Sequence, residues 1–317
     1  MILALAGGVG AARMLSGLVQ VVEPSRITAV VNTGDDLVLH GVKVCPDLDT
    51  VTYTLAGMIN PETGWGLRDE TWSAMAELRE YSRGRLGWFN LGDRDLGTHL
   101  YRTSRLAEGA TLSAVAAEIA LRWGVHCRLL PMTHDRVETK VVITVDGADA
   151  EVDFQEYFVH RRHAVAVSAV RFAGVDSASA APGVLESISS AERIVICPSN
   201  PLVSIAPILA TGGIAEAVAA VRSKVTAVSP IVGGRALKGP ADRMLSELGH
   251  TSDAAGVARL WAPYAATMVI DEVDAGLATA VEDTGMRAIV APTVMSDAGK
   301  AAALAEVVLG QEKESRS

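Results

Sequence analysis

The stretch ILALAGGVGAAR at residues 2–13 joins five apolar residues to a glycine-rich turn and then to a helical pattern. Strand, glycine turn and helix in this order are typical of the first unit of a doubly wound α/β sheet. Gly8 and Gly10 would let backbone N–H groups approach a phosphate, next to the dipole of the following helix. Arg13 would add a charge-assisted contact. The stretch therefore predicts a Rossmann-like fold with a phosphate site at its first turn.

The same turn departs from the fingerprint of dinucleotide-binding enzymes. Arg13 occupies the place of the third glycine, and the second apolar strand ends in Asn32, where an NAD ribose would need an acidic residue. The turn has no Gly-Lys-Ser/Thr, which excludes a P-loop. An NAD(P)-dependent oxidoreductase is therefore an alternative with weak support, and a tight turn without a ligand is the purely structural alternative.

Composition narrows the class of protein. The chain has 317 residues and a formal net charge of −9, which argues against a broad nucleic-acid-binding face. Cys45, Cys127 and Cys197 are widely spaced, which favours a reducing compartment over a disulfide framework. The sequence has no run of 18 apolar residues and no basic signal-peptide region at its start, so we expect a cytoplasmic protein without a membrane segment.

Short β-branched runs alternate with helical patterns, which predicts a mostly parallel sheet. A span of about 52–175 reads differently, because helical patterns are followed by alternating, antiparallel-type strands. We therefore expect one α/β nucleotide-binding domain over residues 1–310, with an insertion at about 52–175 and a polar tail at 311–317. The strands expected in the main sheet after the first are 27–31, 194–197, 225–228, 268–270 and 288–291.

Four carboxylates follow the second strand within about fifteen residues, at Asp35, Asp36, Asp47 and Asp49. Such a group is costly unless it is solvated, bound to metal or paired with cations. Because Mg²⁺ takes one or two carboxylates together with phosphate oxygens, the segment predicts a magnesium site. The alternative is that Asp47 or Asp49 caps a helix that begins near Thr50, and both roles can hold together.

The segment at residues 88–99 leads from aromatic residues through alternating charges into a helix that we expect from about Thr98. Trp88 or Phe89 could stack on a planar ring, and Asn90 could recognise the edge of that ring. The alternative is a surface loop in which Asp93 and Asp95 pair with Arg94.

Two further loops follow predicted strands of the same sheet edge. Ser199 and Asn200 offer a hydroxyl and an amide, while the segment at 229–240 adds Arg235 and Lys238, which suit a diphosphate. The remaining histidines show no metal-ligand spacing and are expected at the surface or satisfied elsewhere, and residues 161–163 are expected in a solvated turn. These histidines are His126, His134, His160, His163 and His250.

Five motifs occur in one order along the chain: GGVG at 7–10, PDLDT at 46–50, GDRD at 92–95, PSNP at 198–201 and GGRALKGP at 233–240. Together they closely resemble the 2-phospho-L-lactate transferase family (CofD/FbiA) of coenzyme F420 biosynthesis. The resemblance runs from the first residues to about Leu309. The acidic, Ala/Val-rich composition resembles that of an actinobacterial member.

The resemblance implies a reaction at phosphorus. The acceptor would be the deazaflavin Fo (7,8-didemethyl-8-hydroxy-5-deazariboflavin), whose terminal ribityl hydroxyl attacks the phosphorus of a lactyl- or enolpyruvyl-diphospho-5′-guanosine. GMP would leave, Mg²⁺ would be required, and an actinobacterial member would use the enolpyruvyl donor. The family also implies a homodimer. Because a related branch lacks this activity, a non-enzymatic nucleotide-binding regulatory protein is a further alternative.

The resemblance also implies roles for single residues. Asp47 and Asp49 would hold Mg²⁺ or orient the attacking hydroxyl, and which of them does which is left open. The nucleotide donor would be held by Gly8, Gly10, Arg13, Ser199, Asn200, Gly234 and Lys238. The Fo pocket would be lined by Asp49, Trp88, Asn90, Asp93, Arg94 and Thr98.

Overall fold

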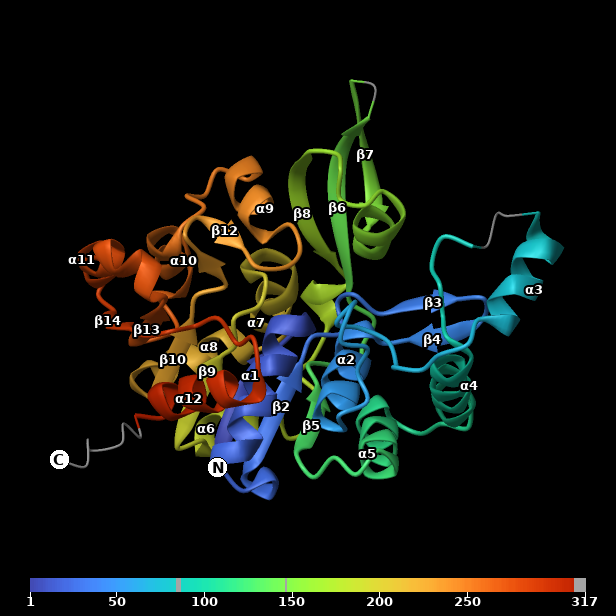
Figure 1. Ribbon diagram of the computed structural model, residues 1–317, viewed down its shortest axis with the longest axis horizontal. Helices are drawn as coiled ribbons and strands as arrows, with labels where there is room; N and C mark the ends of the chain where they lie inside the picture. The colour runs from blue at the N-terminus through green and yellow to red at the C-terminus, as the bar shows by residue number, and fades with distance from the viewer. Residues whose placement is uncertain (84–86, 146, 311–317) are drawn as a thin grey trace.

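A central sheet of parallel strands organises the chain, for which the computed structural model describes residues 1–83, 87–145 and 147–310 (Figure 1). Its strands are β1 (Ile2–Ala6), β2 (Ile27–Val31), β5 (Arg128–Pro131), β9 (Arg193–Ile196), β10 (Val225–Val228), β13 (Thr267–Ile270) and β14 (Arg287–Val290). They lie in the order β14-β13-β10-β9-β1-β2-β5, and every neighbouring pair is parallel. The predicted Rossmann-like α/β fold is confirmed.

Helices cover both faces of this sheet. One face carries α1 (Gly8–Val21), α2 (Pro46–Leu55), α5 (Leu112–Arg122) and α12 (Ala298–Val308). The other carries α6 (Val184–Ser190), α7 (Ala206–Ala210), α8 (Ile214–Ala220), α9 (Ala241–Glu247), α10 (Ala254–Trp261) and α11 (Ala278–Glu282).

The side chains of β1 alternate between the two hydrophobic cores, one on each face of the sheet. Leu3 and Leu5 are buried against the α6–α10 face, whereas Ile2, Ala4 and Ala6 are buried against the α1–α12 face. Because successive side chains of a strand point to opposite faces, a strand covered on both sides must be apolar throughout. This is why the first strand could be recognised as a continuous apolar run.

The strand order reverses between β1 and β9. Chain connections run from β1 outward to β2 and β5 on one side, and from β9 outward to β10, β13 and β14 on the other. The loops after β1 and β9 therefore diverge and leave a crevice at the carboxyl ends of the strands. At its base, a Cβ on Gly10 would lie 1.9 Å from the carbonyl oxygen of Pro198, so only glycine permits this approach.

Two additions rise from the carboxyl edge of the sheet (Figure 1). The first holds the hairpin of β3 (Leu37–Leu39) and β4 (Val42–Val44), with α3 (Ser73–Ser82) and α4 (Asp93–Ala107). The second is an antiparallel sheet in the order β7-β6-β8, formed by β6 (Glu138–Val145), β7 (Ala148–Asp153) and β8 (Val167–Ala173). The span of about 52–175, predicted as one insertion, thus contains α5 and β5, which belong to the main layers.

Strand β5 is the member of the main sheet that the sequence pattern did not predict. It is short, ends in Pro131 and lies at the edge of the sheet beside β2. An edge strand tolerates proline because only one side of it must donate hydrogen bonds. Helix α4 also begins earlier than expected, at Asp93, and the predicted tail at 311–317 lies outside the described residues.

We predict that Gly10→Ala destabilises the fold by about 2 kcal/mol or more, because the added Cβ would overlap a backbone oxygen that cannot rotate away. The matched control is Gly97→Ala in α4, where no atom lies within 4 Å of the added Cβ. Removing a glycine from a helix interior there should stabilise by roughly 0.5–1 kcal/mol. Denaturant unfolding of both variants measures the difference, and equal stabilities would contradict the tight approach.

Candidate functional site

The crevice at the switch point opens into a cleft of about 870 Å³. Its floor is formed by the loop after β1 and by the first turns of α1 and α2, and its walls come from both additions and from the loops after β9 and β10. Of the residues predicted to act in the site, those lining the cleft are Gly8, Gly10, Arg13, Asp47, Asp49, Trp88, Asn90, Ser199, Asn200 and Lys238. Asp93, Arg94, Thr98 and Gly234 do not line it.

Helix α1 points its N-terminus into the cleft. It begins at Gly8 directly after β1, and its first turn contains no acidic side chain. The backbone N–H of Gly8 donates a hydrogen bond to the carboxylate of Asp47. The glycine-rich turn therefore offers the helix dipole to the cleft and also holds one of the predicted metal ligands.

Two basic side chains flank this helix N-terminus. Arg13 donates to the backbone oxygen of Met295 at 3.3 Å, and Lys238 Nζ donates to the backbone oxygen of Thr63 at 3.0 Å. Burial and the neighbouring charge of Arg13 lower the pKa of Lys238. Within residues 1–83, 87–145 and 147–310, neither cation forms an ion pair with a carboxylate. The pair is a concentration of positive charge that an anion would relieve.

The four clustered aspartates separate into two kinds. Asp36 forms an ion pair with Lys43 at 3.1 Å, and Asp49 forms a buried ion pair with Arg102 of α4. Asp35 and Asp47 lie next to each other without a basic partner in the described part of the chain, and each is 7% exposed. The sequence showed the cluster, but it could not show which carboxylates were already neutralised.

Burial dominates the protonation of the unpaired carboxylates. It raises the pKa of Asp47 to about 7, against the hydrogen bonds from Asn32 and Gly8. Burial and the nearby charge of Asp47 raise the pKa of Asp35 well above its usual value. The Oδ1 atom of Asp35 is buried and has no hydrogen-bond partner among the described residues. Two adjacent carboxylates with one oxygen unsatisfied fit a divalent cation.

The helix that follows the acidic segment begins earlier than predicted, so the predicted aspartate cap is not formed. Helix α2 begins at Pro46 rather than near Thr50, because proline is favoured at the first helical position. Asp47 and Asp49 therefore lie inside the first turn, where the helix dipole favours negative charge, and neither is the capping residue.

Asp93, which does not line the cleft, and Glu70, which does, each cap the helix start of the other's segment. The carboxylate of Asp93 accepts hydrogen bonds from the Thr71 hydroxyl and from the backbone N–H groups of Ser73 and Ala74, at the start of α3. The carboxylate of Glu70 accepts from the backbone N–H groups at the start of α4, at 2.9 and 2.8 Å. These paired caps join the two segments that form one wall of the cleft.

The other residues predicted to contact Fo interact with different parts of the protein. Arg94 directs its guanidinium toward the ring of Trp123, 6.0 Å from the ring centre, and Thr98 contacts the hydroxyl of Tyr53. Asn90 lines the cleft while its Oδ1 accepts from Arg79 at 2.7 Å. Their contacts with Fo stay predictions.

An aromatic wall faces the cleft from the connection between β7 and β8, which the sequence did not indicate. Phe158 stacks between Phe154 and His163, with ring centres 5.6 and 5.4 Å apart, and Trp65 meets its edge. His163 was expected in a solvated turn, but it lines the cleft and has a positive φ of 42°. Rings separated by loops and turns have no periodic pattern, so sequence alone does not reveal this wall.

The loops after β9 and β10 contribute in different ways. Ser199 is 5% exposed, and its Oγ has no hydrogen-bond partner in the described residues, so it can bind a ligand in the cleft. Asn200 caps the turn that follows by accepting from the backbone N–H of Leu202 at 2.9 Å. Gly234 lies in the turn between β11 (Ile231–Val232) and β12 (Arg235–Ala236) with a φ of 77°.

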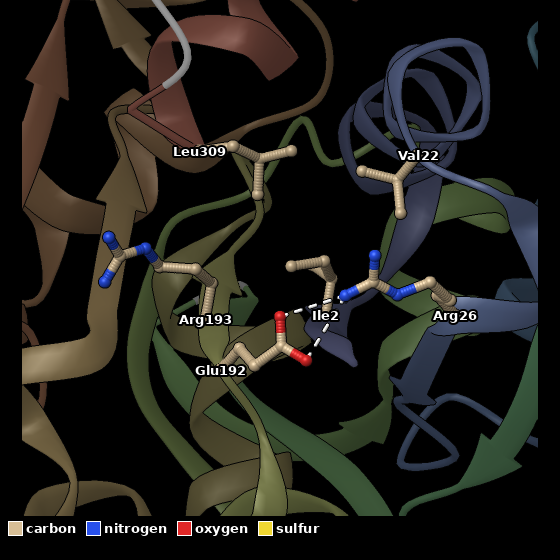
Figure 2. A pocket seen from close by; sticks show the side chains of 6 residues that line it. All are labelled: Ile2, Val22, Arg26, Glu192, Arg193 and Leu309. Carbon is tan, nitrogen blue, oxygen red and sulfur yellow. Dashed lines mark hydrogen bonds and ion pairs between the residues drawn. The ribbon is translucent and has the colours of Figure 1, made fainter.

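A second, smaller pocket lies at the opposite edge of the sheet (Figure 2). Ile2 and Arg193 open β1 and β9 there, and Arg26 and the N-terminal ammonium both pair with Glu192. Glu192 is neutralised in this way, whereas Arg193 has no ion-pair partner among the described residues, and this pocket has a single carboxylate in its lining. Among all the described residues, including those of the large cleft, no group of three or more His, Cys, Asp or Glu side chains is placed to hold a metal ion. No helix in the described part of the chain has the length and apolarity to cross a membrane.

Comparison with known proteins identifies the relatives of this chain. The family model described as 2-phospho-L-lactate transferase CofD matches residues 2–301. The phosphoenolpyruvate transferase of Streptomyces griseus subsp. griseus is 48% identical, over 100% of this chain and 99% of the relative. That of Kitasatospora aureofaciens is 47% identical, over 99% and 98% respectively.

A solved structure shares the fold. The crystal structure of a UPF0052-family protein from Bacillus halodurans aligns with a TM-score of 0.60 and 16% sequence identity, covering 97% of this chain and 98% of that one. At this identity the likeness concerns the α/β fold alone.

We predict a pH-dependent stability from Asp47. Its pKa is about 7 in the folded protein against a usual 3.8, so the folded state holds a proton that the unfolded chain has released. The free energy of unfolding should therefore fall as the pH rises between these two values. Asp47→Asn removes this contribution and should flatten the decline, as measured by denaturant unfolding at roughly pH 5 and pH 8 with a chelator present.

The control for this experiment is Asp297→Asn. Hydrogen bonds from the start of α12 lower the pKa of Asp297, which places its titration below the window studied. This variant should keep the slope of the native protein. An unchanged slope in Asp47→Asn would show that Asp47 is ionised in the folded state throughout the window.

Proposed function

The chain belongs to the 2-phospho-L-lactate transferase CofD family and is a phosphoryl-group transferase of coenzyme F420 biosynthesis, and on that premise we propose its donor, acceptor and metal. The donor is enolpyruvyl-diphospho-5′-guanosine, the acceptor is the terminal hydroxyl of Fo, and GMP leaves with Mg²⁺ bound. The observation that carries this proposal is that Asp35 and Asp47, Arg13 and Lys238, and the N-terminus of α1 belong to one cleft, with no ion pair formed by these four side chains among the described residues.

The donor's diphosphate would lie against the N-terminus of α1. Among the described residues, Arg13 and Lys238 donate to backbone oxygens, and both can exchange these for phosphate oxygens. Ser199, whose hydroxyl has no hydrogen-bond partner among the described residues, would lie near the transferred group. The enolpyruvyl form is favoured over the lactyl form because relatives 42–48% identical to this chain are named phosphoenolpyruvate transferases.

Mg²⁺ would be held by Asp47 together with Asp35. Asp35 belongs to the acidic cluster that predicted a magnesium site, although the resemblance named only Asp47 and Asp49 as ligands. Its unsatisfied oxygen and its proximity to Asp47 fit the cation. Asp49 fits less well, because Arg102 already neutralises its carboxylate. When bound, Mg²⁺ would neutralise charge on phosphate oxygens during transfer.

The chain's own groups would act mainly by positioning. Transfer of a group at phosphorus requires aligned reactants and charge stabilisation more than a covalent intermediate on the protein. Asp49, fixed by Arg102, is suited to orient the attacking hydroxyl rather than to bind metal. The deep position of the acidic pair also limits the access of water, which would otherwise compete with Fo.

The alternatives left open by the sequence have less support. An NAD(P)-dependent oxidoreductase would need an acidic ribose ligand after β2, where Asn32 instead donates to Asp47 and accepts from the backbone of Gly34. A non-enzymatic nucleotide-binding protein is not what the matched family describes. The expected cytoplasmic location and homodimer remain part of the proposal.

The proposal is tested by turnover. Purified protein, Fo and Mg²⁺ are combined with the enolpyruvyl donor or with the lactyl donor, and the deazaflavin product and GMP are detected by mass. We expect product and GMP with the enolpyruvyl donor and loss of both with a chelator. Product with the lactyl donor alone would overturn the donor assignment, and no binding of Fo would overturn the acceptor.

We predict that Lys238→Met raises KM for the donor by about tenfold or more, because a charged hydrogen bond to phosphate is lost. The affinity for Fo, measured by its fluorescence, should stay unchanged. The matched control is Lys224→Met, since Lys224 also donates to a backbone oxygen but lies before β10, at the amino ends of the strands. Equal KM values for the two variants would argue against a diphosphate contact at Lys238.

A further inference from the structure

Asp95 is a cleft residue of the GDRD motif, for which the sequence suggested only a pairing with Arg94 that does not form among the described residues. It lies in the first turn of α4, lines the cleft and is 13% exposed. Its backbone N–H is held by Glu70 at 2.8 Å, so the paired caps fix its position. The side chain is therefore presented to the cleft from a rigid helix start.

One carboxylate oxygen of Asp95 is committed and the other is free. Oδ1 accepts a hydrogen bond from the hydroxyl of Tyr53 at 2.7 Å and lies 3.4 Å from Nε2 of His99. Oδ2 has no partner in the part of the chain that the structure describes, and it is not among the fully buried unpaired atoms. An accessible, unpaired carboxylate oxygen on a cleft wall is available to a donor group of a ligand.

The contacts of His99 determine which of its ring nitrogens carries the proton. Arg102 Nη1 lies 3.1 Å from His99 Nδ1, and a guanidinium can only donate. Nδ1 must therefore carry a lone pair, which leaves the ring proton on Nε2, facing Asp95. Arg102 thus serves both carboxylates, since it neutralises Asp49 directly and orients the imidazole toward Asp95.

Asp95 lies beside a later turn of α2 than the acidic pair does. Its partner Tyr53 follows Asp47 by six residues on α2, which corresponds to a rise of about 9 Å along the helix. A ligand that contacts both Asp47 and Asp95, which both line the cleft, would connect these two positions by a chain of atoms. That chain must carry hydrogen-bond donors, because Oδ2 is an acceptor.

We propose that Asp95 Oδ2 binds a hydroxyl of the acceptor's polyol chain and so fixes how far along the cleft the attacking hydroxyl is presented. The inference rests on the proposed acceptor, Fo, whose ribityl chain bears hydroxyls between the ring and the terminal group. Asp95 touches the substrate, whereas Tyr53, His99 and Arg102 are positioning residues that act through it.

The decisive variant is Asp95→Asn. Tyr53 and His99 both present protons, so the amide oxygen should take the place of Oδ1 and the NH₂ group the place of Oδ2. The cleft would then meet a neutral donor in place of a charged acceptor. The probes are Fo and a deazaflavin that carries a methyl group at N10 in place of the ribityl chain, both followed by fluorescence.

We expect Asp95→Asn to weaken Fo binding and to raise KM for Fo by about tenfold or more, with the affinity for the N10-methyl compound unchanged. Tyr53→Phe, which keeps the carboxylate but frees its Oδ1, should weaken Fo binding less, by about threefold, and also spare the N10-methyl compound. Glu108→Gln, at the far end of α4, is the control with native affinity for both.

The outcomes distinguish a failure of Fo as the proposed acceptor from a failure of Asp95 as its polyol contact. If the native protein does not bind Fo, the proposed acceptor fails and this inference fails with it. If the native protein binds Fo and Asp95→Asn binds it equally well, Asp95 alone is overturned. An equal loss of both probes in a folded Asp95→Asn protein would place the contact at the ring or in the general shape of the cleft, and would also overturn the polyol assignment.

Discussion

The backbones of two loops touch where β1 and β9 part, and the cleft depends on that contact. Gly10 has no Cβ, so the first turn of α1 can lie against the carbonyl of Pro198. This approach closes the base of the crevice and aims the helix N-terminus, while the loop after β9 brings Ser199 to the same point. The chemistry of the site therefore begins with a packing constraint on a single residue.

Charge is distributed unequally over the cleft. Lys43 and Arg102 neutralise Asp36 and Asp49. Within the part of the chain that the structure describes, Asp35 and Asp47 have no cationic partner, and Arg13 and Lys238 have no carboxylate partner. A fold selected for stability alone would bring these opposite charges together. Leaving them apart costs stability and keeps both signs of charge available to a phosphorylated ligand and its metal.

Features with a local cause could be predicted from the sequence. The apolar strands, the glycine turn and the acidic cluster each follow from neighbouring residues, and all three occur where they were expected. The edge strand β5 was missed because it is short and ends in proline. The alternation of hydrophobic residues predicts which segments are strands, but it does not reveal where an isolated edge strand pairs.

Features that join distant segments could not be predicted. Arg102 meets Asp49 across 53 residues, and Asp93 reaches the start of α3 across about twenty. A loop carboxylate that caps a remote helix has the same sequence as one that binds a ligand. The motif around Asp93 lies in a wall of the cleft. Only the fold distinguishes Asp93, which holds that wall together, from Asp95, which lines the cavity.

The buried pair of Asp49 and Arg102 affects how variant libraries of this family should be interpreted. Truncating Asp49 would leave the buried guanidinium of Arg102 without its counter-charge. Removing one partner of a buried ion pair typically lowers the free energy of unfolding by about 3–5 kcal/mol. A scan that scores cellular activity would then rank Asp49 among the most sensitive positions, even if its only fault were a lower abundance of folded enzyme. Sensitivity at a buried ion pair reports on the yield of protein as well as on chemistry, and the two separate only when the amount of folded protein is measured alongside.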